Sequence, residues 1–225
     1  MKRHLEKYIA PLRRQFEMLA DPVKAAFEHK YVREKFEFYG LGAKVLREAT
    51  KEFFSKNGYT KAEKLGELSL FLWNLNEREY QQVVVDLLHK FANKLKKEDI
   101  SWIEQLIVSK SWWDTVDGLA AWICGTYFIN YPEQIIPVTG VWMDSNNIWL
   151  QRSALLFQLK YKRKTDTDLL GNYIERLINH KDFFIRKAIG WVLREYSKTN
   201  PIWVKTFVKE HSLSGLSYRE AIKYI

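Results

Sequence analysis

A helical repeat with a period of about 35 residues constrains the fold of this chain more than any other feature. Four segments open alike: REYQQVVVDLL (78–88), SWWDTVDGLAAW (111–122), NIWLQRSALLF (147–157) and DFFIRKAIGWVL (182–193). The spacings are 34, 36 and 35 residues when the segments are aligned on Gln82, Val116, Arg152 and Lys187. Helix-pair repeats of this length bury their apolar faces against their neighbours. We therefore predict an all-α solenoid, a superhelix of HEAT-like antiparallel helix pairs in which residues 1–225 form a single domain.

Apolar residues recur with helical periodicity along the rest of the chain as well. The turns of an all-β protein need more glycine and proline than the 10 Gly and 5 Pro present. Periodicity predicts helices near 3–19, 22–37, 41–56, 61–74, 77–91, 98–109, 112–129, 132–143, 147–162, 167–179, 182–197, 201–209 and 217–225.

The charge points to a polyanionic partner. A formal net charge of +9 is typical of proteins that bind nucleic acid, although such a charge can also serve solubility alone. The five histidines lack metal-ligand spacing, and the sequence has no glycine-rich phosphate loop and no CxxC motif. We expect no metal and no cofactor.

The expected compartment is the cytoplasm. The single cysteine, Cys124, cannot form an internal disulfide, which suits a reducing environment. No stretch approaches the ~20 apolar residues that cross a bilayer, and the N-terminal MKRHLEKYIA lacks the apolar core of a signal peptide. We expect a monomer with no membrane partner.

Two oppositely charged residues lie on apolar helix faces. In the helix 112–129, Asp117 shares a face with Trp113, Val116, Ala120, Ala121 and Cys124. In the next copy of the repeat, Arg152 lies within a stripe formed by Ile148, Leu155, Leu156 and Leu159. A buried carboxylate needs a cationic partner, good donors or a function. Asp117 and Arg152 either pair with each other or both face a groove in which DNA supplies the phosphate.

A tryptophan lies on the polar side of the helix 182–197. The core face of this helix consists of Ile185, Ala188, Ile189, Val192, Leu193 and Tyr196. Trp191 points away from that face, near Lys187 and Arg194. Exposed aromatic residues among cations are typical of stacking on nucleic acid. The alternative is that Trp191 packs against the helix of the next repeat.

Three long segments resemble the AlkD family of DNA alkylation-repair glycosylases. They are SWWDTVD (111–117), DSNNIWLQRSALLFQLKYK (144–162) and FFIRKAIGWVLREYSKTNP (183–201). The resemblance implies a HEAT-like repeat enzyme that hydrolyses the N-glycosidic bond of cationic N3- or N7-alkylated purines in duplex DNA, without flipping the base. It also implies association with the bacterial nucleoid when the protein acts on DNA.

The resemblance assigns a role to each of these unusual positions. It implies that Trp113 and Trp191 contact the sugar and backbone of the damaged nucleotide, that Asp117 lies beside the sugar, and that Arg152 holds the nearby phosphate. Tyr31 matches a tyrosine that helps to form the cleft, and we expect Lys187 and Arg194 to bind DNA.

The first third of the chain matches the family least. Gly42 stands where the best-known members carry a glutamine that approaches the duplex, so lesion range and rate stay open. Two alternatives to an enzyme follow from the same sequence. One is a non-catalytic HEAT-like repeat protein that binds damaged or branched DNA, and the other is a helical scaffold whose charge is incidental.

Overall fold

The computed structural model describes residues 2–58 and 64–225, and every regular element in these ranges is a helix. This confirms the all-α prediction. The chain divides into two compact units, Met1–Leu106 and Ile107–Ile225, with the boundary inside helix α6. The prediction of a single repeat domain and of a superhelix that joins the units stays a prediction. No helix in the described ranges is both long and apolar enough to cross a membrane.

The described part of the first unit contains helices α1 to α5 and most of α6, which crosses the boundary. Short 3-10 turns at Ala92–Lys94 and Lys97–Asp99 precede α6. The helices are α1 (Lys2–Leu19), α2 (Pro22–Tyr31), α3 (Gly42–Asn57), α4 (Leu65–Trp73), α5 (Arg78–Phe91) and α6 (Ile100–Val108). Helix α3 packs against α1 and α5. A buried carboxylate, Glu79, ties the loop before α3 to α5 by accepting hydrogen bonds from the backbone N–H groups of Gly40 and Leu41.

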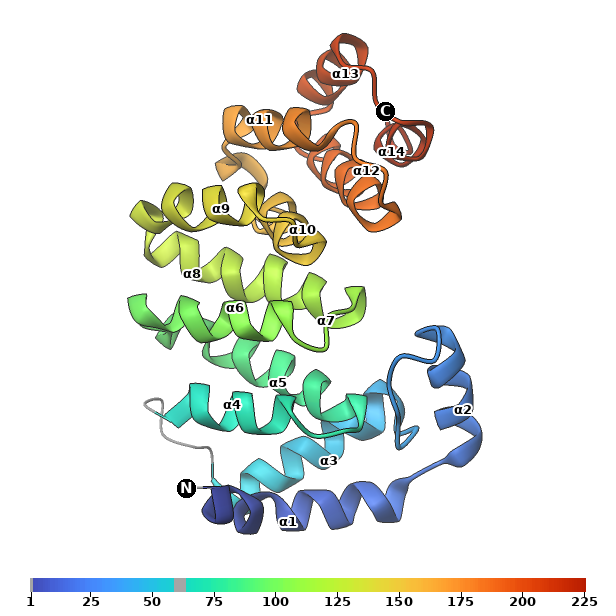
Figure 1. Ribbon diagram of the computed structural model, residues 1–225, viewed down its shortest axis with the longest axis vertical. Helices are drawn as coiled ribbons and strands as arrows, with labels where there is room; N and C mark the ends of the chain where they lie inside the picture. The colour runs from blue at the N-terminus through green and yellow to red at the C-terminus, as the bar shows by residue number, and fades with distance from the viewer. Residues whose placement is uncertain (1, 59–63) are drawn as a thin grey trace. The chain divides into compact units, whose positions relative to one another are not determined.

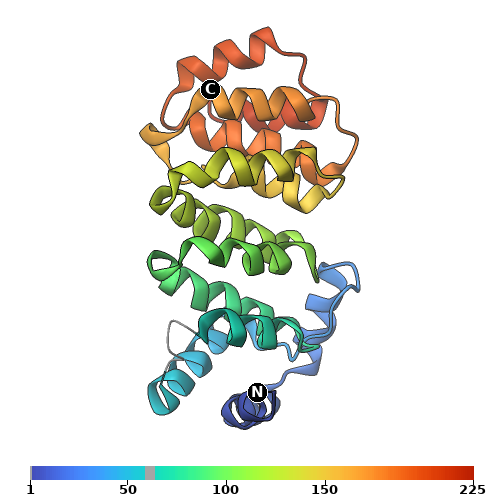
Figure 2. The same ribbon diagram turned by 60° about the vertical axis from the view of Figure 1, so that its left-hand side comes forward.

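The second unit stacks its helices in successive layers (Figures 1 and 2). They are α7 (Trp113–Gly118), a π-helical turn (Leu119–Cys124), α8 (Gly125–Asn130), α9 (Ile135–Asp144), α10 (Ile148–Leu156), α11 (Thr167–Leu177), α12 (Phe183–Ser197), α13 (Pro201–Glu210) and α14 (Gly215–Ala221). Short 3-10 turns occur at Pro132–Gln134 and Lys162–Lys164.

The aligned repeat positions fall at equivalent places in their helices. Gln82, Arg152 and Lys187 are each the fifth residue of α5, α10 and α12, and Val116 is the fourth residue of α7. In the second unit α10 packs against both α7 and α12, so three copies of the repeat are neighbours in space. Trp149 and Phe184, each three residues before its register position, are in contact.

Several predicted helix boundaries are wrong for local reasons. The predicted helix 22–37 ends at Tyr31, because Arg33 and Glu34 both adopt a φ of 59°, which a right-handed helix excludes. The predicted helix 147–162 ends at Leu156, and the Gln158 side chain then bonds to the backbone of Asp166 in both directions. The helix predicted at 61–74 is seen from Leu65, and its first residues, 61–63, lie outside the described ranges.

Candidate functional site

Three neighbouring helices of the second unit bring the two unusual charges together. Asp117 is in the last turn of α7, and Arg152 is in the middle of α10. The Asn147 side chain fixes the start of α10 by accepting hydrogen bonds from the backbone N–H groups of Trp149 and Leu150. The Asp182 side chain caps α12 in the same way. Capping sets the first residue of each helix and hence the face on which its later side chains lie.

Asp117 and Arg152 form a bidentate ion pair. Nε of Arg152 donates to Oδ1 at 2.7 Å, and Nη2 donates to Oδ2 at 2.8 Å. A third N–H, on Nη1, donates to the backbone carbonyl of Phe184 in α12 at 2.5 Å. The Arg152 side chain is only 4% exposed, whereas that of Asp117 is 18% exposed. Of the two arrangements that the sequence left open, the structure has the mutual pair.

Burial and pairing shift the pKa of Asp117 in opposite directions. Desolvation raises the pKa, the hydrogen bonds and positive charge of Arg152 lower it, and the result is a pKa above the ordinary aspartate value. The planar guanidinium holds both carboxylate oxygens, so it fixes the plane of the carboxylate as well as its position. The exposed part of Asp117 can still meet a ligand.

Trp113 and Trp191 both remain partly accessible. Trp113 starts α7 one turn before Asp117 and on the same face, and it is half-buried. In α12 every residue of the predicted core face is buried, whereas Trp191 is half-buried. The Trp191 indole has no hydrogen bond or ring–ring contact with residues 2–58 or 64–225. Trp191 follows Phe184 by two helical turns, so the two side chains lie on the same side of α12.

A cluster of three aromatic rings includes Phe184, whose backbone carbonyl accepts a hydrogen bond from Arg152. The rings of Trp112, Trp149 and Phe184 have centroid separations of 4.9 to 5.8 Å. Trp149 and Phe184 occupy the same position of the repeat, three residues before the register position. No joint role for these rings was predicted from the sequence. The shared register was the signal that would have found the cluster.

A π-helical turn follows Asp117 directly. The predicted continuous helix 112–129 is wrong in this detail, because Leu119–Cys124 forms i→i+5 turns between α7 and α8. All residues of the turn except Trp122 are buried. Single π-turns inside α-helices are frequent at functional sites, since the extra residue re-aims the side chains before it.

Lys187 and Arg194 both bind a carboxylate of the last helix. Lys187 Nζ donates to Oε1 of Glu220 at 2.8 Å, and Arg194 bonds to the other carboxylate oxygen. Nζ of Lys223 lies 3.1 Å from Oε1 of Glu220. These cations lower the pKa of Glu220 to about 2. The Glu220 side chain is 8% exposed, and its ion pairs hold Lys187 and Arg194, the two cations that we predict to bind DNA.

The close approach of α12 and α14 depends on a glycine. A Cβ atom at Gly190 would lie 2.4 Å from the Cβ of Glu220 and 2.8 Å from the backbone oxygen of Ser217. Any side chain at position 190 would push the helices apart. The lack of a Cβ at Gly190 therefore lets Glu220 reach Lys187 and Arg194.

Tyr31 belongs to the first unit. It ends α2, a helix without a buried residue, and its side chain is exposed. Gly42 has a φ of +64°, with nothing within 4 Å of the place where its Cβ would be. A glutamine there would have space for its side chain but a strained backbone. Among the described residues no group of three His, Cys, Asp or Glu side chains could hold a metal ion.

The chain is similar to known DNA-repair proteins. The family model described as DNA alkylation repair enzyme matches residues 12–225. The chain is 33% identical to a predicted DNA alkylation repair enzyme from Enterococcus faecalis, with a TM-score of 0.85 over 92% of this chain and 96% of that one. This protein therefore belongs to the DNA alkylation repair enzyme family.

Two other similarities are more distant. AlkD2 from Streptococcus mutans has a TM-score of 0.62 and 18% identity, over 80% of this chain and 90% of that one, and it shows the same fold. The CCA-adding enzymes of two Saccharolobus islandicus strains are 19% identical over 178 residues, which are 74% of this chain. The chain spans 43% of the length of these curated relatives.

Proposed function

We propose that this protein is a monofunctional DNA glycosylase that hydrolyses the N-glycosidic bond of cationic N3- or N7-alkylated purines in duplex DNA. The observation that carries the proposal is the Asp117 carboxylate, which Arg152 holds in a bidentate ion pair while 18% of the Asp117 side chain stays exposed. Family membership supports a role in alkylation repair, and the reaction itself is our inference.

The chemistry needs only one carboxylate because the substrate is already charged. When the C1′–N bond of an alkylpurine cation breaks, both electrons of that bond go to the base nitrogen and the base leaves neutral. The sugar becomes an oxocarbenium-like cation. Asp117 would oppose this charge and orient the water that bonds to C1′, and the proton released by the water passes to the carboxylate or to solvent.

Arg152 acts mainly on Asp117 in this proposal. Arg152 keeps the carboxylate in one orientation. It also favours the ionised form of Asp117, which burial disfavours. A guanidinium has five N–H bonds, and three are used by Asp117 and Phe184. The phosphate contact implied by the resemblance would have to use the other two.

Trp113 and Trp191 would flank the reacting sugar. An indole face beside a developing cation contributes ~1–2 kcal/mol when the site is desolvated. Lys187, Arg194 and Tyr31 would bind the sugar-phosphate backbone and so hold the nucleotide in place. Because backbone groups are gripped, the base can stay stacked, and bulky adducts would then be tolerated.

The test is base release from methylated duplex DNA. We expect free 7-methylguanine and an abasic site with an intact strand, since no lysine is assigned as a Schiff-base nucleophile. Release should need no added metal or cofactor. Binding of the duplex without base release, at any enzyme excess, would instead support the non-catalytic DNA-binding alternative.

A further inference from the structure

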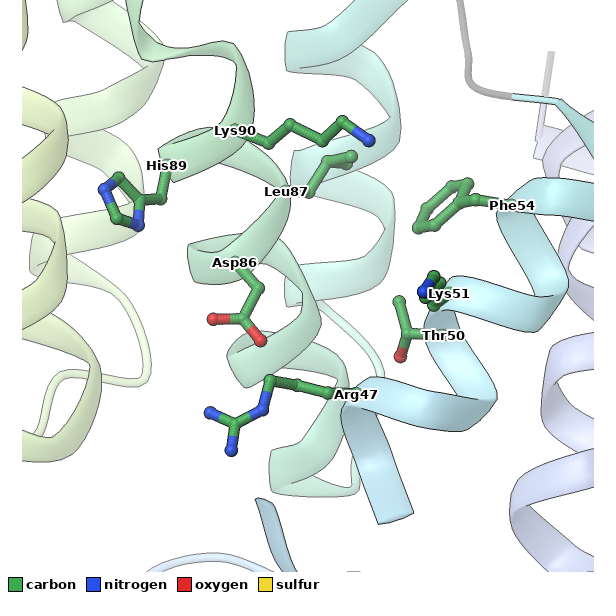
Figure 3. A pocket seen from close by; sticks show the side chains of 8 residues that line it. All are labelled: Arg47, Thr50, Lys51, Phe54, Asp86, Leu87, His89 and Lys90. Carbon is green, nitrogen blue, oxygen red and sulfur yellow. The ribbon is translucent and has the colours of Figure 1, made fainter. Parts of the chain in front are cut away.

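A pocket in the first unit lies between α3 and α5, and the proposed reaction does not use it. Its volume is about 500 Å³. Figure 3 shows side chains from both helices around it. The lining residues are Arg47, Thr50, Lys51, Phe54, Asp86, Leu87, His89 and Lys90.

The rim of this α3–α5 pocket is exposed and mainly cationic. Arg47 and Lys51 extend from α3, Lys90 extends from α5, and Asp86 is the one carboxylate of the lining. Neither Arg47 nor Lys51 forms a salt bridge within the described residues, and Arg47 attracts Asp86 only at longer range. The rim is therefore suited to an anion that bears more than one negative charge.

The floor of the pocket is apolar and contains a hydroxyl that lacks a partner. Phe54 and Leu87 are each 3% exposed, and both line the pocket. The Oγ1 atom of Thr50 is buried and has no hydrogen-bond partner. Buried polar atoms are nearly always hydrogen-bonded. Less than 1 Å² of this oxygen is exposed, so a ligand in the pocket reaches it only when the Thr50 side chain turns toward the pocket.

We propose that the α3–α5 pocket binds a nucleotide, with its phosphate among Arg47, Lys51 and Lys90 and its base against Phe54. The Thr50 hydroxyl donates a hydrogen bond to a phosphate oxygen. The ligand chemistry is a phosphate ester next to a flat apolar ring, and it can come from a free mononucleotide or from one unit of a nucleic-acid strand. This site is separate from Asp117 in sequence and in chemistry.

Calorimetric titration of the full chain tests the proposal. The probes are dAMP, deoxyadenosine, inorganic phosphate and a single-stranded pentanucleotide. We expect dAMP to bind at least tenfold more tightly than deoxyadenosine or phosphate, because only dAMP fills both rim and floor. A free-nucleotide site binds dAMP more tightly than the pentanucleotide, and a strand site shows the reverse order.

Two variants and one matched control make the test specific. Lys51→Gln should weaken binding of the preferred probe at least fivefold, whereas Lys44→Gln removes an exposed charge from the same helix outside the pocket and should change it less than twofold. Thr50→Val should weaken binding without lowering the Tm, since it removes a hydroxyl that has no partner.

The outcomes separate this site from the proposed reaction. Equal effects of Lys51→Gln and Lys44→Gln, or a preference for inorganic phosphate over both dAMP and the pentanucleotide, would overturn the nucleotide pocket. Asp117→Asn should leave binding of the preferred probe unchanged. Absence of base release with intact nucleotide binding would contradict the proposed reaction alone. Base release without nucleotide binding would contradict the α3–α5 pocket alone.

Discussion

The position of Asp117 combines burial with a fixed partner, and this combination determines what the residue can do. A carboxylate on an apolar helix face is costly unless it is neutralised or well bonded. Arg152 supplies two hydrogen bonds and a full charge, and it is itself fixed by the Phe184 carbonyl. The pair therefore has a structural role in the free protein. In the proposed catalytic role, the damaged nucleotide would contact the exposed edge of the carboxylate.

The raised pKa of Asp117 predicts an acid limb in the pH profile. The ionised form is needed to oppose the sugar cation, so activity is present above the pKa and is lost as the pH falls through it. Burial places that loss above the ordinary aspartate value of about 3.9. Single-turnover rates of 7-methylguanine release between pH 4 and 8, corrected for release without enzyme, measure the limb. A rate that stays constant down to pH 4 in a folded protein would contradict this assignment.

Trp191 should matter more for the reaction than for stability. Trp191→Ala removes a half-buried indole that has no hydrogen bond or ring–ring contact in the described ranges, so we expect less than about 2 kcal/mol of destabilisation. Loss of a cation–π contact should slow base release about tenfold. Trp142 is fully buried, and Trp142→Ala should instead cost about 3–5 kcal/mol in urea unfolding. Equal destabilisation of the two variants would show that Trp191 is a core residue.

At the scale of single helices, periodicity predicted the buried faces well and the interruptions poorly. All six residues of the predicted core face of α12 are buried. Helix α10 ends at Leu156, and the Gln158 side chain just after it bonds to the backbone of Asp166, a contact that sequence periodicity does not detect. The π-turn after Asp117 has the same apolar composition as an α-helix, so only its backbone bonding distinguishes it.

The charged partners in the candidate site show a similar limit. Spacing placed Asp117 and Arg152 on apolar faces and left their pairing open, because the relative rotation of α7 and α10 depends on packing. The contact of Lys187 and Arg194 with Glu220 was missed entirely. It depends on a close approach at Gly190 between α12 and α14, and the four aligned segments of the repeat do not extend to α14.

The contact between α12 and α14 should make stability depend on acid through Glu220. Its folded pKa of about 2 is below the unfolded value of about 4.3, so its contribution is fully present above the unfolded value and is lost as the pH falls through about 2. Glu220→Gln should therefore lower the Tm at pH 7, and the difference from the wild type should shrink from pH 4.5 to pH 2. A difference in Tm that is the same at pH 7 and pH 2.5 would contradict this role for Glu220.

For the molecule as a whole, the net charge of +9 should make DNA binding strongly dependent on salt. If about five phosphates are neutralised, a plot of log affinity against log salt concentration has a slope near −4 to −5. Fluorescence anisotropy with a labelled duplex between 50 and 300 mM NaCl measures this slope. Affinity that does not change over that range would favour a helical scaffold whose charge is incidental.

The proposed reaction depends most directly on the charge of Asp117. Asp117→Asn keeps the size of the side chain and one oxygen acceptor for Arg152, but it removes the negative charge that opposes the sugar cation. We predict single-turnover release of 7-methylguanine from duplex DNA at least ~10²-fold slower than in the wild type, about 3 kcal/mol in the activation free energy. Circular dichroism and duplex binding must be unchanged for the comparison to hold. A folded, DNA-binding Asp117→Asn protein that releases the base at the wild-type rate would contradict the proposed mechanism.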